Sequence, residues 1–212
     1  MIIETYNAGS FGCNAIILGD RLLNQAVVVD PGDAVQETLL RLKKLRLRAV
    51  AIVHTHAHVD HTMGSALLSE VTGAPTYLHE GDTKLHACMD MQAMEMGFRL
   101  DVSTPMDKSL KDMSCIEFGR FQLGVIHTPG HTPGSICLEV PGQNLCLTGD
   151  TLFKGGIGHT TKWGGDPDQL KKSIRSRLYG MHGSVKILPG HGHPSTIDYE
   201  RLTNPYVRKT LI

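Results

Sequence analysis

The chain has 212 residues, and its 21 Lys plus Arg are balanced by 21 Asp plus Glu, so the formal net charge is zero. A neutral chain without runs of like charge is not expected to bind nucleic acid, and no apolar stretch approaches the roughly 20 residues that span a bilayer. The length predicts one domain, residues 1–212, with a core that needs no disulfides. The five cysteines show no CxxC spacing and residues 1–9 do not resemble a secretory signal, so we expect a cytoplasmic protein.

The first half of the chain predicts strands that alternate with helices. Two short apolar strands come first, and Pro31 and Gly32 mark a turn after the second. The next segment has apolar residues at helical spacing, and it is followed by a buried strand that ends directly in a cluster of histidines. The predicted strands are 14–18, 25–29, 49–53 and 76–78, and the predicted helices are 34–45, 64–71 and 81–97.

The second half returns to strands after an irregular segment that reaches to about residue 114. Asp166 and Pro167 predict the N-cap and first position of a helix that extends to about residue 179. No linker rich in Pro, Gly or Ser separates the halves, so the pattern favours an α/β (α+β) fold with two packed sheets and outer helices over one doubly wound sheet. The predicted strands of this half are 114–118, 121–127, 135–140, 145–148 and 186–188.

Histidine is the unusual residue of this composition, with 12 copies, several of them clustered in loops after apolar strands. The densest cluster is the run His56-Ala-His58-Val-Asp60-His61. Imidazole and carboxylate are the ligands that a divalent ion such as zinc prefers. Alternation along an extended segment points His56 and His58 the same way. One ion cannot take all four ligands from so short a loop, so the motif indicates two ions.

Three further candidate ligands follow later strands. His131, Asp150 and His191 each stand next to a glycine, which permits the backbone turn that aims a side chain inward. Any one of these residues alone is as well explained as an ordinary loop residue. The whole set of seven, in which each member follows an apolar strand, favours a metal centre.

The order of these motifs resembles the metallo-β-lactamase superfamily. Residues 128–135 (TPGHTPGS) and 148–153 (TGDTLF) are similar to the glyoxalase II (hydroxyacylglutathione hydrolase) branch, and the resemblance covers residues 30–191. It implies a four-layer αββα sandwich with the site at one edge. It also implies that Asp30 supports the ligands without being one. The implied ligands are His56, His58 and His131 for metal one, Asp60, His61 and His191 for metal two, and Asp150 as a bridge between them.

The chain departs from the glyoxalase II pattern in two places. Full-length members carry a C-terminal helical domain that contacts glutathione, and we expect a compact form without it. Members also have Arg or Lys soon after the TGDTLF motif, where this chain has His159, which carries less positive charge at neutral pH. We expect His159 and Trp163 to contact substrate, although Trp163 could equally cover a core edge. Lys154 and Lys162 could supply positive charge for an acidic substrate.

The predicted function is metal-dependent hydrolysis of a thioester such as S-lactoylglutathione. Two divalent ions, zinc before iron or manganese, are expected to share a water and lower its pKa to about 7, and Asp60 is expected to orient that water as the catalytic residue. A thioester suits the site because a thiolate leaves without a strong general acid. One alternative is a mononuclear iron persulfide dioxygenase on the same fold, and another is hydrolysis of a phosphodiester or lactone.

Several residues remain outside this scheme. The flanking His54, His127 and His193 are expected to be polar loop residues, and His79 and His86 to lie at the surface or at helix ends. The methionines of residues 89–113 suit a substrate lid, a subunit contact in a homo-oligomer or ordinary packing. The expected partner is a small-molecule thioester, with neither nucleic acid nor membrane.

Overall fold

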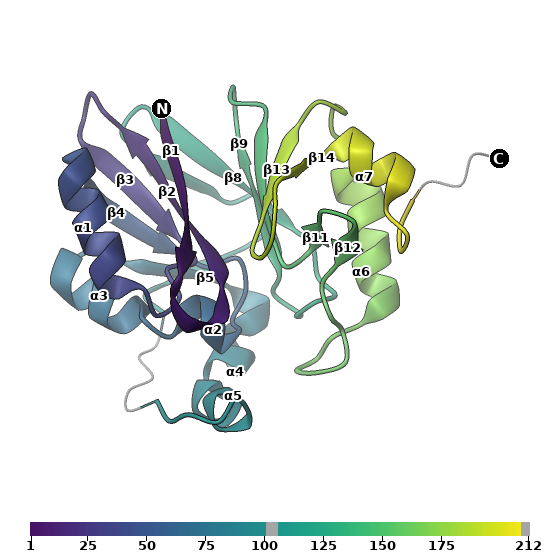
Figure 1. Cartoon of the computed structure of the whole chain (residues 1–212), viewed down its shortest axis with the longest axis horizontal. Helices are drawn as coiled ribbons and strands as arrows, with labels where there is room; N and C mark the ends of the chain where they lie inside the picture. Colours follow the sequence, from purple (N-terminus) through teal and green to yellow (C-terminus); the bar gives the residue numbers. More distant parts are fainter. Residues whose placement is uncertain (101–105, 209–212) are drawn as a thin grey trace.

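The computed structural model describes residues 1–100 and 106–208, which form two packed six-stranded sheets with helices on their outer faces (Figure 1). This arrangement confirms the predicted αββα sandwich. The strands of the first sheet are, in spatial order, β1 (Ile2–Ala8), β2 (Cys13–Asp20), β3 (Gln25–Val29), β4 (Arg48–Val53), β5 (Thr76–His79) and β6 (Lys108–Leu110). Those of the second are β14 (Ser195–Thr196), β13 (Lys186–Pro189), β10 (Leu145–Gly149), β9 (Ile136–Val140), β8 (Phe121–His127) and β7 (Cys115–Phe118).

The sheets are apolar on both faces because each is covered on both sides. In β3, Val27 and Val29 face the second sheet, whereas Ala26 and Val28 belong to the cluster under the helices. The first sheet is covered by α1 (Val35–Leu45) and α3 (Ser65–Thr72), and the second by α6 (Pro167–Ser173) and α7 (Ile197–Thr203) (Figure 1). Side chains therefore form three apolar layers, one between the sheets and one beneath each pair of helices.

The strand directions place many loops at one edge. β3, β4 and β5 are parallel neighbours in the first sheet, and β8, β10 and β13 share one direction in the second. The carboxyl ends of parallel strands meet at the same edge, which is where open α/β sheets bind ligands. Backbone hydrogen bonds join the two halves there, from Asn14 N–H to Gly190 O (2.7 Å) and from Ile136 N–H to Thr55 O (2.8 Å). Loops from both halves therefore share this edge.

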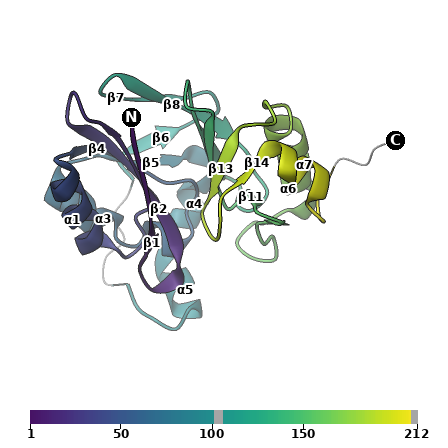
Figure 2. The ribbon, with the colours of Figure 1, turned by 45° about the horizontal axis from the view of Figure 1, so that its top comes forward.

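Several elements differ from the sequence-based predictions. The single helix predicted at 81–97 is a 3₁₀ turn (Glu80–Asp82), α4 (Thr83–His86) and α5 (Met89–Glu95), and Figure 2 shows α5 projecting from the edge of the sandwich. The helix predicted to reach residue 179 changes after Ser173 into a π-helical turn (Ile174–Leu178). In the predicted irregular segment, residues 108–110 form β6, and residues 101–105 lie outside the described residues.

Other elements were not predicted at all. They are β1, β14, α7, the short helix α2 (Val59–Thr62), and the hairpin of β11 (Leu152–Phe153) and β12 (Gly156–Ile157). Most are short, and β1 is an edge strand with exposed polar residues, so each lacks the apolar periodicity that marks a longer buried element. The N-cap at Asp166 was predicted correctly, since its side chain accepts hydrogen bonds from the N–H groups of Asp168 and Gln169. Within the described part of the chain, every helix is too short or too polar to cross a membrane.

Candidate metal centre

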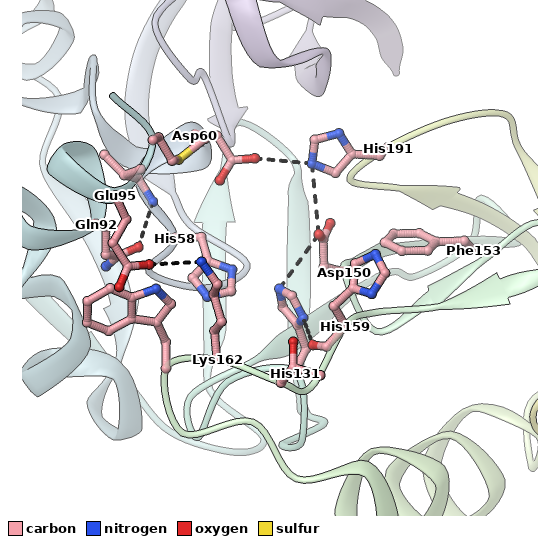
Figure 3. Close-up of a pocket in the computed structure, with 14 residues that line it drawn as sticks. His58, Asp60, Gln92, Glu95, His131, Asp150, Phe153, His159, Lys162 and His191 are labelled. Carbon is pink, nitrogen blue, oxygen red and sulfur yellow. Dashed lines mark hydrogen bonds and ion pairs between the residues drawn. The ribbon is translucent and has the colours of Figure 1, made fainter. Parts of the chain in front are cut away.

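The loops at the shared edge bring all seven predicted ligands together. Figure 3 shows the five that line the cavity, His58, Asp60, His131, Asp150 and His191. The ligand atoms form groups whose members lie within 4.8 Å of one another. We call His56, His58 and His131 set one, and Asp60, His61 and His191 set two. The loops after β8 and β13 of the second sheet supply His131 and His191, while the other ligand histidines follow β4 of the first sheet. Residues that span positions 56 to 191 therefore converge on one centre.

Set one has the spacing of a tetrahedral metal site. His56 Nε2 lies 3.1 Å from His58 Nδ1 and 3.3 Å from His131 Nε2. Ligand bonds of about 2.0–2.1 Å at tetrahedral angles place neighbouring ligand atoms about 3.3 Å apart. The three nitrogens of set one thus fit a single small divalent ion.

Set two has the same spacing with one carboxylate. His61 Nε2 lies 3.2 Å from His191 Nε2, and Asp60 Oδ2 lies 3.3 Å from His191 Nε2 and 3.6 Å from His61 Nε2. The two sets are therefore each complete as a group of three ligands. This arrangement can hold two ions rather than one.

Asp150 lies between the sets, directly after β10. Its Oδ2 is 3.6 Å from His131 Nε2 of set one and 3.8 Å from His191 Nε2 of set two, and its Oδ1 is 3.6 Å from His61 Nε2. Oδ1 is buried and has no hydrogen-bond partner. A buried carboxylate oxygen without a donor is strongly unfavourable unless a cation compensates it. The residues present thus fit a bridging ligand between two metal ions.

Hydrogen bonds on the far side of the rings orient the imidazoles. His131 Nδ1–H donates to the backbone oxygen of His159 (2.6 Å), and His191 Nδ1–H donates to the backbone oxygen of Gly12 (3.2 Å). Each bond fixes the tautomer in which the Nε2 lone pair faces the centre, which is how metal-binding histidines are usually held.

Asp30 holds the imidazole of His61 and the loop that carries it. Its Oδ2 accepts from His61 Nδ1–H (3.1 Å) and from the Thr55 hydroxyl (2.6 Å), while Oδ1 accepts from the Thr55 N–H (2.8 Å). Cys13 Sγ lies 3.3 Å from the same His61 nitrogen. Asp30 itself has a φ of +47°, a strained conformation of the kind that persists where surrounding contacts enforce it. It therefore lies where a residue that supports the ligands must lie, and it does not reach the centre.

The electrostatics differ between the sets. Burial lowers the pKa of His58 to about 3, that of His131 to about 4 and that of His56 well below its usual value, so all three rings of set one are neutral with lone pairs available at physiological pH. In set two, burial lowers the pKa of His61, but Cys13, Asp30, Asp150 and Asp60 together raise it well above its usual value. Surroundings that favour an imidazolium also favour a metal cation.

A cavity of about 510 Å³ opens over the ligands. One part of the lining comes from the end of α5 and the residue after it, with Gln92, Glu95 and Met96. Another part comes from the loop that carries His159 and Lys162, and Figure 3 shows Lys162 beside Glu95. His159 and Trp163, the predicted substrate contacts, both line this cavity, and Trp163 also packs against a small apolar cluster that includes Ala57. The Lys162 ammonium donates to Glu95 Oε2 across the cavity (3.0 Å). Val59, Phe153 and Thr161 complete the lining outside the ligand set.

The structure corrects part of two predictions about the other histidines. His79 caps the 3₁₀ turn of residues 80–82 and His86 ends α4, so both lie at helix ends as predicted, but both are buried, at 5% and 6% exposure. His79 stacks on His127, with ring centroids 4.0 Å apart, and so joins β5 to β8. His54, expected to be a polar loop residue, is fully buried and neither of its ring nitrogens has a hydrogen-bond partner.

Sequence analysis also missed residues that shape the site. Asp82 and Gln92 hold ligand loops, while Glu95, Met96 and Phe153 line the cavity. Asp82 follows a predicted strand closely, so its position at a strand end was a usable signal. Phe153 ends the TGDTLF motif and Met96 belongs to the methionine-rich segment, but neither was singled out as a cavity residue. Gln92 and Glu95 belong to no motif, and only their packing places them here.

The fold and this centre define a family. Residues 8–193 match the metallo-β-lactamase superfamily, and the chain belongs to it. Hydroxyacylglutathione hydrolase GloC of Haemophilus influenzae is 31% identical over 209 residues, which cover 98% of both chains. Mitochondrial persulfide dioxygenase ETHE1 of Bos taurus is 31% identical over 194 residues, which cover 89% of this chain and 69% of that protein. The glyoxalase II-like resemblance is thereby confirmed at the level of the branch.

Solved structures agree with this placement. The B3 metallo-β-lactamase BLEG-1 superimposes with a TM-score of 0.91 at 28% identity and covers 98% of this chain and 100% of its own. TTHA1623 in a di-iron-bound form superimposes with a TM-score of 0.86 at 31% identity and covers 97% of this chain and 100% of its own. The chain is therefore similar throughout to members with different named activities, and its own residues must decide among them.

Proposed function

We propose that this protein is a two-metal hydrolase of acyl thioesters of the S-lactoylglutathione type. The observation that carries the proposal is the presence of two complete ligand sets joined by Asp150. A similar chain that is named as a di-iron form, TTHA1623, supports two ions, and the similarity to GloC supports a thioester substrate. We propose zinc as the ion, with iron or manganese as alternatives, because histidine and carboxylate ligands suit all three.

In this proposal the metal ions activate a water molecule and Asp60 orients it. When bound, a pair of divalent ions lowers the pKa of a shared water to about 7 and polarises a carbonyl oxygen. Burial raises the pKa of Asp60, but His61 and His191 beside it lower it below its usual range, so Asp60 is ionised at neutral pH. Its carboxylate lines the cavity and can accept a hydrogen bond from a water, which orients the water toward the acyl carbon.

The cavity suits a leaving group that needs no proton. Apart from the candidate ligands, its titratable side chains among the described residues are Glu95, Lys162 and His159, and the first two are paired with each other. A thiolate leaves unprotonated because its thiol has a pKa of about 8.5, whereas an amine leaving group requires a general acid. Trp163, Phe153 and Met96 supply apolar surface for the acyl group and the carrier. The thioester is thus the ester class that this lining serves best.

The test combines metal content with turnover. Purified protein is expected to hold two divalent ions per chain and to hydrolyse S-lactoylglutathione, with release of thiol followed by a chromogenic disulfide. Asp60→Asn is expected to lower kcat by at least about 10³-fold, because it removes both a ligand charge and the group that orients the water. The overall fold, followed by circular dichroism, is expected to persist. Two bound ions without thioester hydrolysis would overturn the substrate class and leave the two-metal site intact.

A persulfide dioxygenase is the main competing function, since ETHE1 is as similar in sequence as GloC. One iron per chain together with oxygen uptake on glutathione persulfide would replace our assignment. Hydrolysis of a β-lactam is a second competitor because of the structural similarity to BLEG-1, and turnover of a chromogenic cephalosporin measures it directly. We place the dioxygenase below the thioesterase because set two is complete, and the β-lactamase below it because, outside the ligand set and the Glu95–Lys162 pair, His159 is the single titratable side chain of the described cavity lining that could protonate an amine leaving group.

A further inference from the structure

A buried carboxylate outside the ligand set, Asp82, joins two of the ligand loops. Asp82 has no exposed surface. Its Oδ2 accepts hydrogen bonds from the Ala57 N–H (2.9 Å) and the Thr132 hydroxyl (2.7 Å), and its Oδ1 accepts from the Gly134 N–H (2.6 Å). One side chain thus spans the loop after β4 and the loop after β8, which come from different sheets.

All three contacts fall beside ligands of set one. Ala57 stands between His56 and His58, and Thr132 directly follows His131. Among the described residues, Asp82 has no hydrogen bond to the loops that carry His191 or Asp150. The carboxylate therefore acts on the distance between the two halves of set one, and set two has its own support in Asp30 and Gly12.

The backbone at Gly134 lies very close to Asp82, and the residue type at position 134 permits this. A Cβ at Gly134 would collide with the backbone nitrogen and the carboxyl carbon of Asp82, so a glycine is required there. The neighbouring His79–His127 stack joins the same two segments. Two independent contacts thus hold the 3₁₀ turn of residues 80–82 against the loop of His131.

A second side chain supports one of these loops but not the other. Gln92 Oε1 accepts from the Val59 N–H (3.1 Å), and its amide donates to Ala57 O (3.1 Å). Gln92 thereby fixes the shape of the His56–His61 run from α5, without contact to the loop of His131. Among the described side chains outside the ligand set, Asp82 alone hydrogen-bonds both to the His56–His61 run and to the loop of His131.

We propose that Asp82 is a positioning residue that sets the spacing of set one and thereby the affinity of set one for its metal ion. The proposal requires metal binding at this centre and is independent of the substrate. Small displacements matter here because residues that orient metal ligands typically contribute 10–100-fold to metal affinity. Asp82→Asn keeps the size of the side chain but places amide hydrogens where Asp82 accepts hydrogen bonds, so at least one of the three contacts is lost.

The experiment separates the two sets. Zn²⁺ affinity is measured by competition with a chromophoric chelator in two backgrounds, His191→Ala, which keeps set one whole, and His131→Ala, which keeps set two whole. We expect Asp82→Asn to weaken Zn²⁺ binding about 10-fold or more in the first background and less than twofold in the second. Equal weakening in both backgrounds, or no change in the first, would overturn the proposal.

Two further variants guard against a purely structural effect. Asp20→Asn alters a buried carboxylate at the opposite end of the sandwich and is expected to lower Tm while Zn²⁺ affinity stays within twofold in both backgrounds. Thr132→Val removes the hydroxyl contacts to Asp82 and to Ser135 but leaves the other two hydrogen bonds of Asp82 in place, and it is expected to weaken set one a few-fold, with set two unchanged. Should Asp82→Asn fail to fold, the Thr132→Val result decides, and an unchanged affinity of set one there would reject the positioning role.

Discussion

The two ends of the sandwich each bury a carboxylate, and they satisfy it in different ways. Asp20 ends β2, and Cys13, which contacts His61, begins it, so the two ends are about 23 Å apart along the strand. Asp20 Oδ2 accepts from the N–H and Nε–H of Arg120 (2.8 and 3.0 Å), and Oδ1 accepts from the Leu22 N–H (2.8 Å). At the other end, Asp150 Oδ1 has no donor at all.

This contrast separates a structural carboxylate from a functional one. Protein donors compensate Asp20, so its charge serves to join the end of β2 to the turn before β8. Asp150 is surrounded by imidazole nitrogens that can all serve as ligands, and an ion is the partner that such a set accommodates. Burial raises the pKa of Asp150, whereas hydrogen bonds from Arg120 lower that of Asp20. The buried carboxylate that the protein leaves uncompensated therefore marks the site.

The largest expected effect comes from Asp150→Asn. Loss of the bridging charge is expected to reduce the metal content from two ions to at most one and kcat/KM by at least about 10³-fold. In the metal-free protein the same change is expected to raise Tm, because it removes a charge whose buried Oδ1 has no hydrogen-bond donor. Metal analysis, turnover and melting in a chelator measure the three effects. A lower Tm for the metal-free variant would show that the protein itself compensates Asp150.

Asp20→Asn is expected to act in the opposite sense on stability. It removes the ion pair with Arg120, and we expect Tm to fall by about 3–8 °C with the metal content unchanged. The folded-state pKa of Asp20 lies below its unfolded value, so its contribution is complete above about pH 4 and is lost as acidification protonates it in the folded state. The difference in Tm between the wild-type protein and Asp20→Asn should therefore shrink on acidification, because only the wild type loses the contribution of Asp20. Equal acid sensitivity of both proteins would contradict this account.

A pH effect of intermediate size is expected at the His79–His127 stack. Burial, and then His127, lower the pKa of His79 to about 4, while Glu80 and Asp112 oppose this shift. The folded state therefore holds the neutral ring, and stability falls as pH drops from the unfolded pKa of about 6.5 toward 4. His79→Gln should reduce the dependence of Tm on pH in this window, whereas His182→Gln, at an exposed position, should not. Parallel Tm curves for wild type and His79→Gln would refute the prediction.

The smallest effect is expected at the mouth of the cavity. Glu95 holds Lys162 in an exposed ion pair, and such pairs contribute little to stability, so a substrate carboxylate can compete for Lys162. Glu95→Gln should lower KM for an anionic thioester about two- to fivefold, and Lys162→Met should raise it by a similar factor, with kcat nearly unchanged. The effect should shrink at high salt because the pair is exposed. A change in kcat with constant KM would instead place these residues in the chemical step.

The main features of the fold and of the centre could be predicted from the sequence. Long buried strands and α1 have clear apolar periodicity, and the ligand motifs consist of rare residue types in an order that resembles one superfamily. Short elements such as β14 and β11 could not be predicted, because two residues carry no period. The burial of His79 and His86 escaped prediction for a related reason, since nothing in a single segment tells which other segment will cover it.

By itself, then, the sequence determined the layer architecture and the candidate ligands, because both depend on patterns within short segments. Only the tertiary structure decided three further features. They are which buried carboxylate is hydrogen-bonded by protein donors, which side chain joins the two loops of set one, and which residues line the cavity. Each of these depends on atoms more than twenty residues apart in the chain, such as the Asp82 contact to Thr132 and the Lys162 contact to Glu95. Packing of the two halves brings these atoms within hydrogen-bond distance, and no local pattern records that distance.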